Sequence, residues 1–183
     1  MRDEKGLVER AKHGDPEAFA QLYEEYVDKI YRYISLRIGN QAEAEDLTQQ
    51  VFLKALESIS SYQFRGIPFT SWLFRIAHNQ VIDYLRKAAR VKNIPLDVSL
   101  TSSESDVARE VEEEFEAEQV KKAIGELTQL QQEVISLRFA GELSTAEVAK
   151  LMGKSEGAIK ALQHSALVAL RKKLLEGRDG KEI

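Results

Sequence analysis

The sequence predicts an all-α protein of two small helical domains joined by an acidic linker. Apolar residues recur every three to four positions along most of the 183-residue chain, the period of a helix buried on one face. No segment alternates convincingly between apolar and polar residues, as a half-buried strand would. Serines, a proline and acids interrupt the pattern at 93–106. We therefore expect domains at 1–92 and 111–183, with a flexible acidic linker at 93–110.

The first helix is predicted to begin at Asp15-Pro16. An aspartate side chain caps the free N–H groups of a helix start, and proline suits the first helical position. Gly39 ends the helix. The apolar residues between them fall at helical spacing: Phe19, Leu22, Tyr23, Tyr26, Ile30, Tyr33 and Ile34.

The second helix begins at Asn40, which with Glu43 forms a plausible capping box. Its apolar positions are Leu47, Val51, Phe52, Ala55, Leu56 and Ile59. A loop at about 60–68 then leads into a third helix, from Phe69 to about Ala89.

The third helix has two faces. At about 100° per residue, one face gathers the expected core residues, which are Phe69, Leu73, Ile76, Ala77, Gln80 and Tyr84. Arg75, Asn79 and Arg86 fall within an arc of about 40° on another side. This basic strip is either a nucleic-acid contact or a solvated face, in which Asp83 would pair with Lys87.

The loop before this helix favours nucleic acid. It places Tyr62, Phe64 and Arg65 beside Gly66. We expect these rings near the surface, because a buried loop leaves backbone polar groups unpaired. Single-stranded nucleic acid stacks its bases on exposed rings, while arginines contact its phosphates.

The C-terminal domain predicts a helix-turn-helix. Thr128 with Gln131 is a possible capping box, and Gly141 closes the helix that follows. A short helix capped by Ser144 and Glu147 then ends at Gly153, where a tight turn needs positive φ. Residues that pack the two helices together recur at suitable positions: Val148, Ala149, Met152, Ile159 and Leu162. The alternative is a helical hairpin with a glycine turn.

The last helix would read duplex DNA. Ser155 can cap it, and Ile159, Leu162, Ala166 and Leu170 share its inner face. The predicted DNA-contacting residues are Ser155, Gly157, Lys160, Ala161, His164 and Arg171. Lys160 and His164 lie nearest the bases, whereas Arg171 is placed to meet phosphate. His164 is equally consistent with a solvated helix residue.

Charge and composition narrow the classes of function. The net charge is -4, unlike that of a free-standing DNA binder, which is usually basic. Residues 1–95 carry 14 basic and 13 acidic residues, 96–120 carry 1 and 9, and 121–183 carry 11 and 8. The chain lacks cysteine, its three histidines show no ligand spacing, and it has no phosphate loop or nucleophile constellation. We expect that the protein binds no metal and no cofactor and has no enzymatic activity. We also expect a cytoplasmic protein that does not insert into a membrane.

Three segments resemble bacterial extracytoplasmic-function sigma factors of the sigma-70 family. "FRG...FTSWLFRIAHNQVIDYLRK" resembles their promoter-melting segment, and "AEDLTQQVFLKA" resembles the segment that binds the polymerase clamp. "LTQLQQEVISLRFAGELSTAEVAKLMGKSEGAIKALQHSAL" resembles their promoter-binding domain. The match covers nearly the whole chain in the right order. The resemblance implies a specificity subunit that recognises and melts promoters of a stress or envelope-response regulon.

The resemblance also implies residue roles. Phe64, Arg65, Arg75, Asn79 and Arg86 would contact the -10 element, with Asn79 in the pocket for a flipped base. The last helix would read the -35 element. Asp46, Gln49 and Gln50 would bind the clamp of the largest polymerase subunit, with Gln50 in place of the usual glutamate. The flap of the second-largest subunit and an anti-sigma factor are further implied partners.

Two other classes compete with this interpretation. A stand-alone helix-turn-helix regulator would use the same last helix on duplex DNA, but leaves the aromatic loop and "EDLTQQVF" unexplained. A helical adaptor that binds other proteins is the third class. A sigma factor accounts for the acidic net charge, because polymerase supplies most of the positive surface and the free chain avoids stray DNA.

Overall fold

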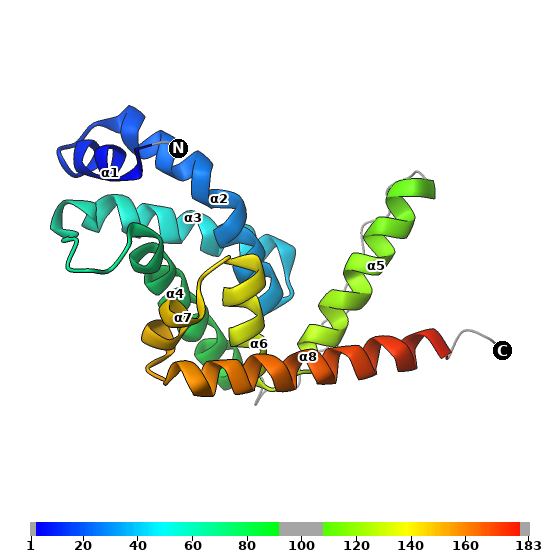
Figure 1. Cartoon of the computed structure of the whole chain (residues 1–183). Coiled ribbons are helices and arrows are strands. Elements are labelled where there is room, and N and C mark those ends of the chain that lie inside the picture. Colours follow the sequence, from blue (N-terminus) through cyan, green and yellow to red (C-terminus); the bar gives the residue numbers. More distant parts are fainter. Residues whose placement is uncertain (1–2, 92–107, 180–183) are drawn as a thin grey trace.

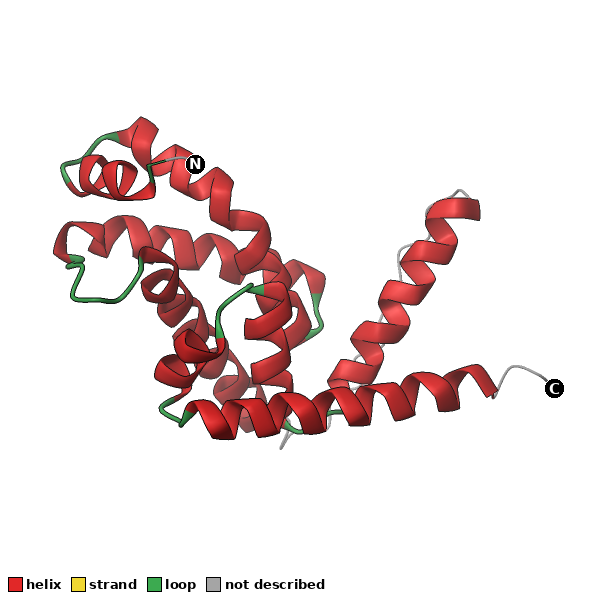
Figure 2. Cartoon of the chain, viewed as in Figure 1, coloured by secondary structure: helices red, strands yellow, loops and turns green. Residues whose placement is uncertain are grey.

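The computed structural model describes residues 3–91 and 108–179, which form helices joined by short turns (Figure 1, Figure 2). This confirms the all-α prediction. The helices are α1 (Glu4–Lys12), α2 (Pro16–Ile38), α3 (Gln41–Ser58), α4 (Phe69–Val91), α5 (Ala108–Gly125), α6 (Gln129–Ile135), α7 (Thr145–Met152) and α8 (Glu156–Asp179). Two short turns follow α3 and α6, namely η1 (Ile59–Ser61) and the π-type turn η2 (Ser136–Ala140).

The predicted helices begin and end where their capping residues indicate. Asp15 accepts hydrogen bonds from the N–H groups of Glu17 and Ala18 at the start of α2, and Gly39 ends α2 with a φ of 72°. At the start of α3, the Asn40 side chain accepts from the N–H of Glu43 at 3.0 Å, which forms one half of the predicted capping box; the Glu43 side chain does not return the bond. Helix α1 was not predicted, and α5 begins at Ala108, inside the predicted linker. Residues 93–107 of that linker lie outside the described residues.

The C-terminal helices also begin and end where their side chains predict. The capping boxes of Thr128 with Gln131 and of Ser144 with Glu147 are both formed. Gly153 adopts the left-handed conformation, with a φ of 62°, which a residue with a Cβ adopts at a cost. Ser155 Oγ accepts from the N–H of Ala158 at 3.2 Å, which caps α8. These contacts build the helix-turn-helix of α7 and α8.

One apolar core joins the N-terminal helices to α6, η2 and α7. Phe74 of α4 is fully buried and packs edge-on against Tyr33 of α2, with ring centroids 5.7 Å apart. A Cβ on Gly141 would lie 2.7 Å from the carbonyl oxygen of Leu137 in η2 and 2.8 Å from Cε1 of Phe74. The φ of Gly141 is -79°, so this glycine is explained by close packing on η2 and α4 and not by a left-handed turn.

A second, smaller core lies where α5 and α6 meet α8. Ile124 and Leu127 from the α5 end, Ile135 of α6, and Ala166 and Leu170 of α8 are buried there. This core holds α8 by its inner face, as its sequence pattern predicts. Helix α8 runs along the side of the molecule away from α1 (Figure 1).

Candidate nucleic-acid and polymerase interface

The basic strip of α4 lies on the surface. Arg75, Asn79 and Arg86 are all exposed, as the helical arc predicts. The carboxylate of Asp83 lies 3.5 Å from Arg86; the predicted pairing with Lys87 is therefore wrong, and the pair is i to i+3. Both side chains are more than half exposed, so this ion pair holds Arg86 only weakly.

The loop at 62–68 presents one ring and buries another. The side chain of Phe64 is 59% exposed, whereas Tyr62 is only 6% exposed. The prediction of a surface ring is confirmed for Phe64 and wrong for Tyr62. Tyr62 is buried because its ring packs against Phe69 and Trp72, and its hydroxyl donates to the carbonyl of Ile67 at 2.8 Å.

The loop lies beside the first turns of α4. Gly66, Ile67 and Pro68 line a small hollow together with Ser71 and Arg75. The structure therefore brings Arg75 close to the loop, while Asn79 follows one turn further along the same exposed strip and Arg86 two turns beyond it. Arg65 is exposed, and Gly66 has a φ of 72° that reverses the chain.

Helix α7 completes the far wall of that hollow. Glu147 accepts a hydrogen bond from Ser71 Oγ at 3.0 Å, and Lys150 lines the same space. Burial raises the pKa of Glu147, but hydrogen bonds from Ser144 and Ser71 and the charge of Lys150 outweigh it and leave the pKa below its ordinary value. The carboxylate is therefore ionised at neutral pH and links α7 to α4.

A second surface lies on α8. The six side chains or backbone positions predicted to contact duplex DNA are all exposed: Ser155, Gly157, Lys160, Ala161, His164 and Arg171. Ser165 lies beside them and accepts a hydrogen bond from Gln131 at 3.1 Å. Among the described residues, these six positions on the outer face of α8 are thus exposed. Of the predicted inner residues, Ile159, Ala166 and Leu170 are buried, whereas Leu162 is half-buried.

A third surface lies on α3. Asp46, Gln49 and Gln50 are exposed, and Gln50 donates to Asp46 at 2.6 Å. Leu47 and Phe52 are buried, as expected for core residues. Leu56 was expected in the core but is 51% exposed, and Leu53 is 57% exposed. Both follow the polar residues at helical spacing, so α3 presents an apolar patch next to a polar one.

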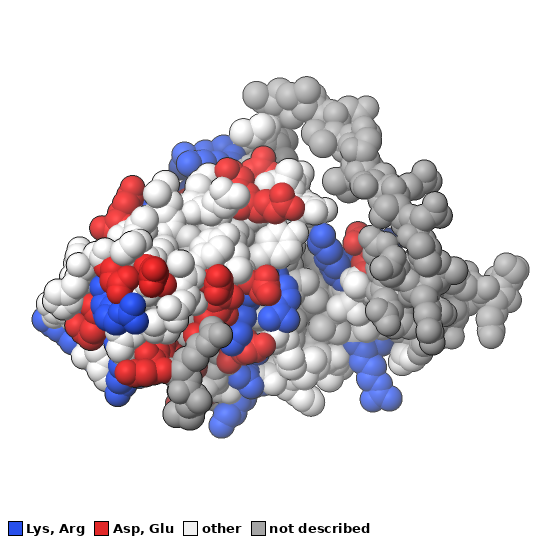
Figure 3. Space-filling model, turned by 90° about the horizontal axis from the view of Figure 1, so that it is seen from above, with Lys and Arg blue, Asp and Glu red and all other residues white. Residues whose placement is uncertain are grey.

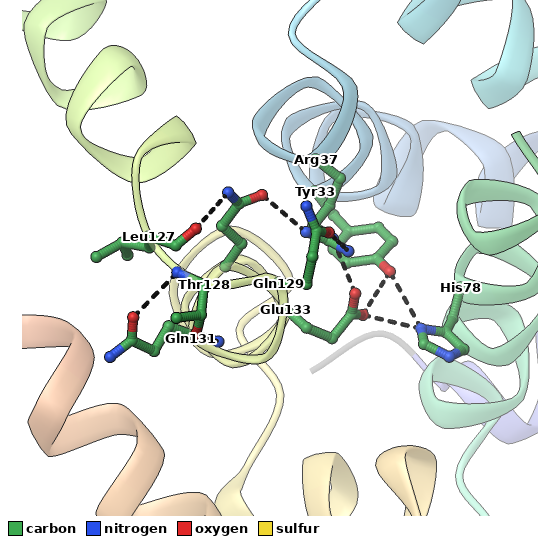
Figure 4. A network of polar contacts seen from close by, with 9 residues as sticks. Tyr33, Arg37, His78, Leu127, Thr128, Gln129, Gln131 and Glu133 are labelled. Atoms are coloured by element: carbon green, nitrogen blue, oxygen red, sulfur yellow. Dashed lines mark hydrogen bonds and ion pairs between the residues drawn. The ribbon is translucent and has the colours of Figure 1, made fainter. Parts of the chain in front are cut away.

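A buried polar cluster joins α2, α4 and α6, and Figure 4 shows its members converging on Glu133. Glu133 Oε2 lies 2.8 Å from Nε of Arg37, and the two side chains are 4% and 2% exposed. The angle of this contact falls outside hydrogen-bond geometry, so the attraction is mainly coulombic. Tyr33 donates to Glu133 Oε1 at 2.7 Å, and Nδ1 of His78 lies 2.9 Å from the same oxygen.

Hydrogen bonds hold the two terminal nitrogens of the arginine in this cluster. Arg37 donates to Gln132 at 3.0 Å and to Gln129 at 3.3 Å. Burial raises the pKa of Glu133, but His78, Arg37 and Tyr33 together bring the pKa below its ordinary value. No single-residue signal in the sequence pointed to this cluster, because its partners are about 55 to 100 positions apart.

The surface charge is mixed. Acidic and basic side chains are interspersed over the face seen in Figure 3. Among residues 3–91 and 108–179, no group of His, Asp and Glu side chains has the arrangement of a metal site. None of the helices in these two ranges is both long and apolar enough to span a bilayer.

Two family models match the chain. Residues 22–91 match sigma-70 region 2, and residues 123–172 match sigma-70 region 4. These spans contain the loop with α4 and the helix-turn-helix, respectively. Helix α1 precedes the first span.

Curated relatives match over most of the chain. The ECF RNA polymerase sigma factor BldN of Streptomyces coelicolor is 41% identical over 170 residues, which cover 92% of this chain and 64% of BldN. The chain thus spans slightly less than two thirds of that relative. The ECF RNA polymerase sigma factor SigW of Bacillus subtilis is 31% identical over 180 residues, which cover 93% of this chain and 96% of SigW.

Solved structures share the fold. CnrH, solved in complex with the cytosolic domain of CnrY, superposes with a TM-score of 0.71 at 24% identity, over 95% of this chain and 97% of CnrH. The sigma factor RpoE, solved with the anti-sigma factor NepR from Bartonella quintana, gives a TM-score of 0.69 at 24% identity, over 85% and 96%. With regions 2 and 4 matched in order, and SigW matched over nearly its whole length, the chain belongs to the ECF RNA polymerase sigma factors of the sigma-70 family.

Proposed function

We propose that this chain directs core RNA polymerase to its promoters and opens the DNA there. Residues 1–92 would bind the polymerase clamp and melt the -10 element, residues 111–183 would bind the -35 element, and 93–110 would link them. The observation that carries the proposal is the exposed ring of Phe64 beside the basic strip of α4, within the span matched by sigma-70 region 2.

The -10 site would work by capturing an unpaired base. Stacking on a ring contributes roughly 1–3 kcal/mol per base, whereas extruding a base from a duplex costs a few kcal/mol. One ring alone therefore does not drive melting. Asn79 adds hydrogen bonds to the captured base, and Arg65, Arg75 and Arg86 contact the phosphates of the strand. Together these contacts offset the cost of unpairing.

The -35 site would use the outer face of α8. A helix of this kind lies in the major groove with its N-terminal residues towards the bases. Lys160 and His164 would reach base edges, and Arg171 would contact phosphate. Ser155, Gly157 and Ala161 lie on the same face and would allow the backbone to approach the groove closely.

Polymerase binding would use α3. Asp46, Gln49 and Gln50 offer polar contacts to the clamp of the largest subunit, and the exposed Leu53 and Leu56 extend that surface with apolar area. The flap of the second-largest subunit is the proposed partner of residues 111–183. An anti-sigma factor is a further proposed partner, since RpoE was solved with NepR. With these proposed partners, the chain would act in the cytoplasm.

Promoter binding would require the two regions to separate. The -10 and -35 elements lie roughly 85 Å apart along the duplex, at about 3.4 Å per base pair. A compact chain of 183 residues is only roughly 40 Å across, from its expected radius of gyration. The packing of α6, η2 and α7 on α2 and α4 would therefore have to open before both elements are held at once.

One transcription experiment tests the proposal. The full-length chain is added to bacterial core polymerase, and transcripts are mapped on fragmented DNA of the source genome. We expect discrete new start sites that depend on the chain and are lost with Phe64→Ala. Binding to DNA fragments without polymerase, together with no new transcripts, would instead support a stand-alone helix-turn-helix regulator.

A further inference from the structure

Tyr62 closes the loop that carries Phe64. The ring of Tyr62 packs edge-on against Phe69 at 5.8 Å and lies 5.2 Å from Trp72, both residues of the first turn of α4. Its hydroxyl donates to the carbonyl of Ile67 at 2.8 Å, five residues further along. One side chain therefore ties the beginning of the loop to its end and to α4.

The residues between these two ties have little freedom. The N–H of Arg65 donates to the carbonyl of Gln63 at 2.9 Å, which makes a tight turn, and Gly66 then reverses the chain with a φ of 72°. Phe64 is at the tip of this turn and projects into solvent. An exposed ring on a preformed loop loses less conformational entropy on binding than a ring on a free loop.

Helix α1 holds the ring from one side. Nζ of Lys5 lies 5.1 Å from the centroid of the Phe64 ring, within the range of a cation–π contact. Helix α1 is itself fixed, because Leu7, Val8 and Ala11 are buried and Asp3 caps its first turn. This helix lies outside the span matched by sigma-70 region 2.

We propose that Tyr62 and Lys5 are positioning residues for Phe64, and that together they hold its ring ready to stack on an unpaired promoter base. Lys5 covers one face of the ring, which leaves the other face for the base and keeps an ammonium group close to the adjoining phosphate. Tyr62 acts through the loop backbone and does not touch DNA. This inference rests on the proposed role of Phe64 in binding the -10 strand.

The test uses the full chain assembled with core polymerase. The probe is a fluorescein-labelled single strand that carries the non-template -10 region of a promoter mapped by the transcription experiment, and binding is followed by anisotropy. Tyr62→Phe keeps the ring and removes the hydrogen bond to Ile67; we expect about fivefold weaker binding. Lys5→Met keeps the aliphatic stem; we expect about two- to fivefold weaker binding, restored by Lys5→Arg.

Matched controls separate positioning from general damage. Tyr84→Phe makes the same change on α4, about four turns from the loop, and Lys12→Met makes the same change on α1. Both should bind the strand like the unchanged protein. Binding of a duplex that carries only the -35 element should not change in any of these variants.

A double-mutant cycle decides whether Tyr62 and Lys5 act through Phe64. In a Phe64→Ala background, Tyr62→Phe and Lys5→Met should cause no further loss of strand binding. Equal losses in both backgrounds would overturn the positioning role. If Phe64→Ala weakens strand binding and the two substitutions have no effect, the inference alone fails. If Phe64→Ala itself has no effect, the proposed -10 site fails and the inference fails with it.

Discussion

Removing the charge of Glu133 should weaken the packing of α6 against α2 and α4. Glu133→Gln keeps the shape of the side chain but leaves the guanidinium of Arg37, which is 2% exposed, without its counter-charge. Breaking one partner of a buried ion pair costs about 3–5 kcal/mol. Gln132 and Gln129 still accept hydrogen bonds from Arg37, so we expect the lower end of that range, about 3 kcal/mol.

The loss is a large fraction of the stability of an ordinary domain, which is about 5–15 kcal/mol. Guanidinium unfolding measures it, with circular dichroism for all helices and the fluorescence of Trp72, the single tryptophan, for the N-terminal helices. The control is Glu142→Gln. Glu142 pairs with Lys29 across the same packing surface at 2.7 Å, but is 54% exposed, so its loss should cost less than about 1 kcal/mol.

The pH dependence gives a second check. The pKa of Glu133 is lowered in the folded protein, so its contribution is complete above its ordinary value of about 4.3 and is lost as the pH falls through the lowered pKa. The difference in unfolding free energy between Glu133 and Glu133→Gln should therefore shrink in acid. Equal destabilisation by Glu133→Gln and Glu142→Gln at neutral pH would refute the assignment of a buried ion pair.

Four further outcomes are expected. Asn79→Ala should lower promoter opening, measured by permanganate reactivity, about tenfold by loss of contacts to one base; loss of core binding in that variant would contradict the assignment. Asp46→Ala with Gln49→Ala should weaken core polymerase binding about tenfold by titration, by loss of two exposed polar contacts, and unchanged affinity would exclude this surface. Lys160→Ala should reduce the discrimination between -35 sequences by about 1–3 kcal/mol in competition binding; unaltered preference would remove it from the reading face. Gly141→Ala should cost about 1–3 kcal/mol in guanidinium unfolding, because the added Cβ overlaps the Leu137 carbonyl oxygen and the Phe74 ring; a smaller cost would mean that η2 and the Phe74 side chain shift to make room.

Most helix ends could be predicted because their signals are local. Asp15, Ser144 and Gly153 act within three or four residues of themselves, through side-chain caps and one left-handed turn. The same holds for the exposed strip of α4 and the outer face of α8, because helical geometry alone decides which residues share a side. These predictions needed no knowledge of what packs against each helix.

The errors have a common cause, which is contact between distant segments. Phe74 lies outside the core face that periodicity predicts for α4, yet it is fully buried because Tyr33 of α2 and Gly141 pack against it. Tyr62 lies in a polar-looking loop, yet α4 buries its ring. Leu56 matches the apolar period of α3 but has no cover. Hydrophobic periodicity and composition describe one helix at a time. They do not reveal which distant segments pack against it.

The sequence by itself determined the all-α class, the helix-turn-helix, the exposed residues of α4 and α8, and the resemblance that led to the family. The tertiary structure decided which ring of the loop faces solvent, that α1 reaches that ring through Lys5, and that Glu133 meets Arg37 in a buried cluster. The physical reason is the sequence separation over which each kind of interaction acts. Caps and periodicity act within a turn or two, whereas Tyr33 and Glu133 are 100 positions apart and meet only when the helices pack.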